Sequence, residues 1–206
     1  SKLFYLKDFK KCQNSLNMVD SCLQKSESAR IGLNNRIYRT IVNLSDVDLR
    51  KDSNFIYDVE EMAREAWANN FNRAYIQSNL VLATLYLKRG EKNDLLISEK
   101  KAITAINYSV RFGIPSYLWQ LYNIISIINI RLGKSKKEIE RNFFSAYNIL
   151  RAQNLLFIGK KDLCYSNILA ISNIAYYLRR NCTQRIFNSH MSAISFFHEE
   201  YSDKNT

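Results

Sequence analysis

The chain has 206 residues, of which 47% are hydrophobic, 24% are charged and 13% are aromatic. A chain of this composition buries a core, which excludes an intrinsically disordered protein. It contains one proline and five glycines, too few for the turns of a β-sandwich or a Rossmann-type sheet, so an all-α fold is predicted. The net charge of +11 is compatible with nucleic acid, an anionic surface or an acidic protein as partner, and equally with a solvated lysine-rich surface.

The four cysteines and two histidines lack the paired spacing of a zinc site, so neither a metal nor another cofactor is expected. We interpret Cys12, Cys22, Cys164 and Cys182 as small core residues in a reducing cytoplasm. The first residues, SKLFYLKDFKKC, do not have the pattern of a secretory signal peptide, and no apolar stretch has membrane-spanning length. We therefore expect a soluble cytoplasmic protein without a membrane partner. Its start within an amphipathic segment, without Met, suggests a piece of a longer protein.

The spacing of apolar residues and the breakers between them predict the first three helices over 3–24, 28–44 and 55–69. A charged loop separates the second helix from the third. The second is expected to bury the stripe Ile31, Ile37, Ile41 and Leu44. The third is expected to end at Asn69 and Asn70 and to bury, on one side, Ile56, Val59, Met62, Ala63, Ala66 and Trp67.

From residue 73 the pattern becomes regular. Helices are predicted over 73–89, 94–112, from just after Pro115 to Gly133, 136–153, 162–180 and 183–201. Gly90, Gly113 and Gly133 each follow a predicted helix, where glycine adopts the left-handed capping conformation. Pro115 suits the first turn of the helix that follows it.

Three helix ends are alike: each has an apolar run, basic residues, a Gly or Asn and a short polar turn into a second helix. They are LATLYLKRGEKND, IISIINIRLGKSKK and ISNIAYYLRRNCTQR. Repeated helix pairs are typical of an α-solenoid, whose repeats bury their faces by stacking. We therefore expect one helical-repeat domain over 1–206, with about four antiparallel helix pairs. It would consist of a capping helix 3–24, a degraded pair 28–69 and the clearer pairs 73–112, 116–153 and 162–201.

The segment NLVLATLYLKRGEKNDLLISEKKAITAI resembles a tetratricopeptide repeat (TPR). Leu82, Tyr86 and Gly90 match its first helix, and Ala102 and Ala105 match the small residues of its second. Weaker matches follow at Ile125, Asn129, Gly133 and Ala146, and then at Asn173, Tyr177 and Ala193. The repeats are longer than the standard unit and lack its consensus Trp and Pro, so they are more similar to the TPR-like regions of bacterial regulators and signalling ATPases.

The resemblance implies a short right-handed α-solenoid with a concave groove that takes a peptide, a protein or another domain of the same chain. We therefore expect a non-catalytic protein-interaction or signal-sensing module, the C-terminal region of a larger bacterial transcriptional or signalling regulator. Self-association through an exposed end of the solenoid is a further expectation.

Basic residues recur at the same place in successive predicted repeats, and stacking would join them into what we call the basic ridge. Its partner-binding residues are expected to be Arg131, Lys134, Lys136, Lys137, Arg180 and Arg185. They would dock phosphates or acidic side chains, so a nucleic-acid-binding helical repeat is the alternative function. Cations at helix C-termini also complement the helix dipole, which explains Lys88, Arg89, Arg131, Arg179 and Arg180 without any partner.

The aromatic residues, Trp67 and Trp119 included, are interpreted as core rather than as a platform for stacking bases. Arg185 and His190 have the Arg-x4-His spacing of HEPN-type ribonucleases, which makes an HEPN-like ribonuclease a remote alternative. Ile186, however, stands where most such enzymes have a polar residue. The sequence contains no phosphate-binding glycine loop, nucleophile elbow or metal-ligand cluster, so we do not expect an enzyme.

Overall fold

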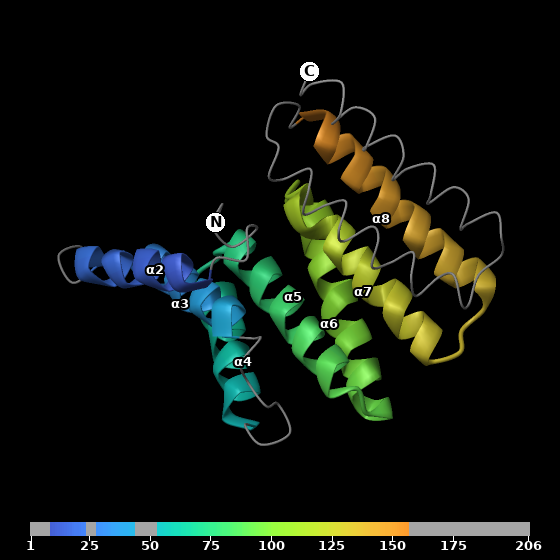
Figure 1. Ribbon diagram of the computed structural model, residues 1–206, viewed down its shortest axis with the longest axis horizontal. Coiled ribbons are helices and arrows are strands. Elements are labelled where there is room, and N and C mark those ends of the chain that lie inside the picture. The colour runs from blue at the N-terminus through green and yellow to red at the C-terminus, as the bar shows by residue number, and fades with distance from the viewer. Residues whose placement is uncertain (1–8, 24–27, 44–52, 157–206) are drawn as a thin grey trace.

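The computed structural model describes residues 9–23, 28–43 and 53–156 (Figure 1). No strand occurs within these ranges, which confirms the predicted all-α fold for this part of the chain. The elements are α2 (Phe9–Leu23), α3 (Ala29–Asn43), α4 (Ser53–Ala68), α5 (Asn72–Arg89), α6 (Lys92–Arg111), the 3-10 turn η1 (Pro115–Tyr117), α7 (Leu118–Arg131) and α8 (Lys136–Leu156). The predicted helices 162–180 and 183–201 lie outside the described residues.

The helices end where the sequence places glycine or asparagine. Gly90, Gly113 and Gly133 have φ angles of +78°, +62° and +65°, which confirms their left-handed conformation. After α6 and after α7, the glycine and the residue that follows it return their N–H groups to carbonyls three and five residues earlier. Asn70, with φ +55°, takes the same role after α4. One local device, the Schellman motif, therefore closes three of the described helices.

Helix α5 lies between its neighbours and is buried on nearly all sides. Its Leu82 packs in a cluster with Leu33 of α3 and residues of α4. Its Ile76 packs in a second cluster with Ala105 of α6 and Leu121 of α7. Because α5 contributes to both clusters, it joins the core of the N-terminal helices to that of α6 and α7.

From α4 to α8, successive helices run in opposite directions and lie side by side (Figure 1). Helix α5 packs most extensively on α6, and α7 packs most extensively on α8. These contacts join the two helices within each of the predicted pairs 73–112 and 116–153. Within the range 28–69 the contacts are different, because α3 packs more extensively on α2 than on α4.

Three residues expected in the core lie at the surface, and one of them is Cys22 of α2, which is exposed. The side chain of Trp67 is 56% exposed and that of Ile31 is 49% exposed. In α4 the fully buried position belongs to Ala66, and the next residue points about 100° further round the helix. Trp67 instead covers Tyr75 and Tyr108, with ring centroids 5.4 Å away in both cases. The prediction that Trp67 belongs to the buried side was wrong, while Trp119 is half-buried.

Neither a membrane span nor a metal centre is found within the described residues. None of the described helices combines the length and the apolar character that crossing a membrane requires. In the same part of the chain, no three His, Cys, Asp or Glu side chains gather as ligands for a metal ion.

Candidate functional site

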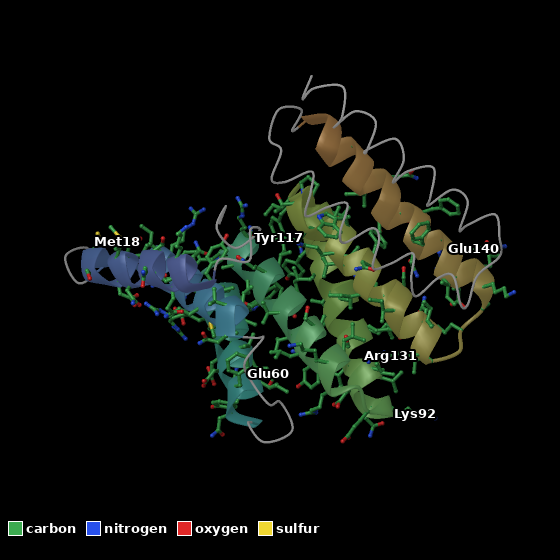
Figure 2. The ribbon with its side chains drawn as sticks, in the orientation of Figure 1. Met18, Glu60, Lys92, Tyr117, Arg131 and Glu140 are labelled. Atoms are coloured by element: carbon green, nitrogen blue, oxygen red, sulfur yellow. The ribbon has the colours of Figure 1, made fainter. Side chains whose placement is uncertain are left out.

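The turns after α5 and after α7 lie together at one end of the helices, which we call the turn end. The Arg131 Nη1 atom donates a hydrogen bond to the Leu87 carbonyl oxygen at 2.7 Å. A Cβ atom added to Gly90 would lie 3.3 Å from the same Nη1 atom. Figure 2 shows Arg131 and Lys92 near this end, and Tyr117 at the opposite one. Arg131, expected in the basic ridge, thus satisfies a backbone carbonyl group in the last turn of α5.

Arg89 forms a two-point ion pair with Asp94 across the α5–α6 turn. Its Nε and Nη2 atoms lie 2.8 Å and 2.5 Å from the two carboxylate oxygens of Asp94. The hydrogen bonds from Arg89 lower the pKa of Asp94, and the backbone N–H of Glu91 adds to the same effect. The side chain of Asp94 is only 3% exposed, so this carboxylate depends on Arg89 to remain charged inside the fold.

Lys134 reaches from the α7–α8 turn to α6. Its Nζ atom lies 2.5 Å from Glu99 Oε1, and both side chains are less than a third exposed. This ion pair joins two helix pairs rather than facing an external partner. Arg131 and Lys134, two residues expected in the basic ridge, therefore bind groups of the chain itself, as Arg89 also does.

Lys136 and Lys137 differ from these cations. Both are exposed in the first turn of α8, and neither has a hydrogen bond or ion pair within the described part of the chain. A helix N-terminus disfavours positive charge, and the dipole there is met by Glu138, whose carboxylate accepts a 2.8 Å hydrogen bond from the Ser135 hydroxyl. Hydrogen bonds from Ser135 lower the pKa of Glu138.

The remaining residues proposed for the basic ridge, Arg180 and Arg185, lie outside the described residues. Arg179 and the Arg185–His190 spacing also lie there. Of the six expected partner-binding residues, the structure thus brings Arg131 and Lys134 into contact with neighbouring helices and leaves Lys136 and Lys137 facing outward.

Helix α6 carries an apolar stripe on its exposed side. Leu96, Ile103 and Val110 are 50%, 44% and 66% exposed. Residues seven apart lie about 20° apart around a helix, so these three side chains form a nearly straight line. The sequence analysis did not identify this stripe, although its seven-residue spacing is visible in the sequence.

A cavity of about 520 Å³ opens at the opposite end of the helices, which we call the cavity end. It is lined by the first turns of α3, the α4–α5 turn and the segment between α6 and η1. Arg30 and Arg73 contribute charge to it, and Phe71 and Ile114 contribute apolar surface. Sequence reasoning missed this site because its walls come from segments that lie far apart along the chain.

The chain was compared with known proteins in three ways. A scan against protein-family models, a search of curated proteins and a search of solved structures each gave no match to this chain.

Proposed function

We propose that the chain is a non-catalytic protein-interaction module of stacked, TPR-like helix pairs. Its architecture is supported by the pattern of helix contacts. Helix α5 contacts both α3 and α7, in addition to its neighbours in sequence. Contact between alternate helices is what stacking of helix pairs requires, and the Gly90 and Gly133 turns lie at the same end of successive pairs.

The observation that carries the interaction function is the apolar stripe of α6, formed by Leu96, Ile103 and Val110. A soluble helix normally turns such a stripe toward a core, and an exposed line of aliphatic side chains favours docking of another apolar surface. Seven-residue spacing suits a partner helix that lies along α6. This surface lies on α6, whereas the TPR resemblance led us to expect a concave groove.

The charges beside the stripe identify the chemistry of the partner. Lys92, Lys100 and Arg111 are exposed on α6. The acidic residue next to the stripe, Glu99, is already bound to Lys134. A second copy of this cationic surface would be repelled, so the stripe fits an amphipathic protein segment whose apolar residues are flanked by Asp and Glu.

Site-specific photo-crosslinking tests this function. A photoreactive amino acid at Val110 would be compared with the same amino acid at Met18, which is 71% exposed on α2. We expect a protein crosslink at position 110 that maps to an acidic amphipathic segment and is lost in Ile103→Asp. The matched variant Met18→Asp should leave the crosslink unchanged.

Three outcomes would contradict the proposal. They are crosslinking at position 110 no stronger than at position 18, a crosslinked segment without acidic residues, and a crosslink that Ile103→Asp does not change.

Fluorescence anisotropy with an RNA and DNA pool tests the alternative function, binding of nucleic acid. Tight binding that falls steeply with salt, and that Lys136→Glu with Lys137→Glu abolishes, would favour nucleic acid as the ligand.

A further inference from the structure

We infer that the cavity at the cavity end binds a small phosphorylated molecule of the size of a sugar phosphate or a nucleoside monophosphate. This ligand goes beyond the proposed protein-interaction function and does not depend on it. The cavity and the α6 stripe have no residue in common, so either can be tested, and can fail, without the other.

The size and composition of the cavity indicate an anionic ligand. A volume of about 520 Å³ falls within the roughly 300–1,000 Å³ typical of small-molecule sites. Two arginines and three asparagines line it, and no Asp or Glu is among the described residues that do so. The polar lining residues are Arg30, Asn34, Asn70, Asn72, Arg73 and Ser116.

Arg30 shares with Arg111 and Arg141 the lack of any side-chain hydrogen bond or ion pair among the described residues, but of these three only Arg30 lines the cavity. Arg36, Arg39, Arg64 and Arg89 each pair with a carboxylate, namely those of Glu65, Asp20, Glu61 and Asp94. Arg30 has no hydrogen bond or ion pair with any described residue. Arg30 lines the cavity, so the donors of its guanidinium group are available to a ligand bound there, and a planar guanidinium fits two phosphate oxygens at once.

Arg73 is held in place beside the same cavity. Its Nε atom donates to the Tyr117 hydroxyl at 3.4 Å, and its guanidinium carbon lies 5.9 Å from the centre of the Tyr117 ring. Tyr117 thereby links the first turn of α5 to η1, and Figure 2 shows it at this end of the helices. A charge fixed in this way loses little side-chain freedom when a ligand binds.

The other walls of the cavity suit the organic part of the ligand. Phe71 and Ile114 are half-buried and provide apolar surface. The amides of Asn34, Asn70 and Asn72 can donate to or accept hydrogen bonds from hydroxyl groups. Inorganic phosphate alone would leave these walls without contacts, so we expect a phosphate group carried on a polar organic body.

Calorimetric titration of the full chain with four probes tests this inference. The probes are ribose 5-phosphate, AMP, adenosine and inorganic phosphate, each at constant ionic strength. We expect at least one of the two phosphorylated organic molecules to bind, and to bind at least tenfold more tightly than adenosine or inorganic phosphate. Arg30→Gln should weaken that binding at least tenfold, and Arg73→Gln should do the same.

Arg141→Gln is the matched control, because it removes an exposed arginine of α8 that has no side-chain hydrogen bond or ion pair among the described residues and does not line the cavity. It should change the affinity less than twofold, and circular dichroism should show that all three variants keep their helix content. The inference is overturned if neither organic phosphate binds, if inorganic phosphate binds as tightly as either of them, or if the three variants weaken binding equally. A short single-stranded RNA that competes more strongly than AMP, with the same dependence on Arg30, would instead assign the cavity to nucleic acid.

Discussion

The two ends of helices α5 to α8 use positive charge differently. At the turn end, Arg89, Arg131 and Lys134 bind a carboxylate or a carbonyl of the chain itself. At the cavity end, Arg30 lines an open space without a carboxylate among the described residues around it. A basic residue therefore either stabilises the fold or stays available to a ligand. The fold decides which, by placing or not placing an acceptor of the chain beside it.

The largest expected effect on stability comes from removing the ion-pair partner of the most buried charge at the turn end. Arg89→Ala leaves the Asp94 carboxylate buried without its ion-pair partner, which should lower the free energy of unfolding by about 3 kcal/mol. Urea unfolding at neutral pH measures this loss. Lys92→Ala, which truncates an exposed cation at the start of α6, is the control and should change stability by less than about 0.5 kcal/mol.

The same ion pair predicts a dependence on pH. Because the pKa of Asp94 is lowered in the folded state from its ordinary 3.8, its stabilising contribution is fully present above that value. The contribution is lost as the pH falls through the lower, folded-state pKa. Asp94→Asn should therefore be less stable than the parent chain at pH 7, and the difference should shrink below pH 3.8. A difference that stays constant down to pH 2 would contradict this account.

A smaller effect is expected from the glycine that adjoins Arg131. Gly90→Ala places a side chain in the left-handed region and 3.3 Å from Arg131 Nη1, which should cost about 1–2 kcal/mol. Gly133→Ala has a similar φ angle but no atom within 4 Å of the added Cβ, so it isolates the backbone cost. Thermal unfolding should rank Gly90→Ala as the less stable of the two.

Gly32→Ala should change the stability in the opposite direction. Gly32 lies within α3, and nothing lies within 4 Å of an added Cβ atom. Alanine at a helix interior should stabilise the chain by up to about 1 kcal/mol. A destabilised Gly32→Ala would show that this part of α3 does not form the helix described.

The smallest expected effect on stability distinguishes Lys134, which forms an ion pair, from Lys136 and Lys137, which face outward. Lys134→Ala removes a partly exposed ion pair with Glu99 and should cost up to about 1 kcal/mol, decreasing with added salt. Lys136→Ala and Lys137→Ala should leave the unfolding free energy unchanged or slightly increased, because each removes a cation from a helix N-terminus. Equal losses for all three lysines would remove the distinction drawn between them.

Features set by neighbouring residues could be predicted from the sequence. Gly113 and Gly133 determine where α6 and α7 end through backbone bonds that span only a few residues. Ser135 and Glu138 follow the S-x-x-E capping pattern, a local signal that the sequence analysis did not use. Helix boundaries near these residues agree with the predicted ones to within a few positions.

Features set by packing between distant segments could not be predicted. Lys134 and Glu99 are 35 positions apart, and nothing in either local sequence indicates that they meet. Arg30 and Arg73 share a cavity only because α3 and α5 lie together. Trp67 was misplaced for a related reason, since helical periodicity defines a face but not which edge of that face the next helix covers.

The bond from Arg131 to the Leu87 carbonyl also has a consequence for the order in which the protein is completed. Residue 131 lies 44 positions after residue 87, so the ribosome makes it later, and chains begin to fold from the N-terminal side. The last turn of α5 therefore emerges before the side chain that closes it exists. Until α7 has been synthesised and has docked, water must satisfy that carbonyl, and the end of α5 is completed only with the helix pair that follows.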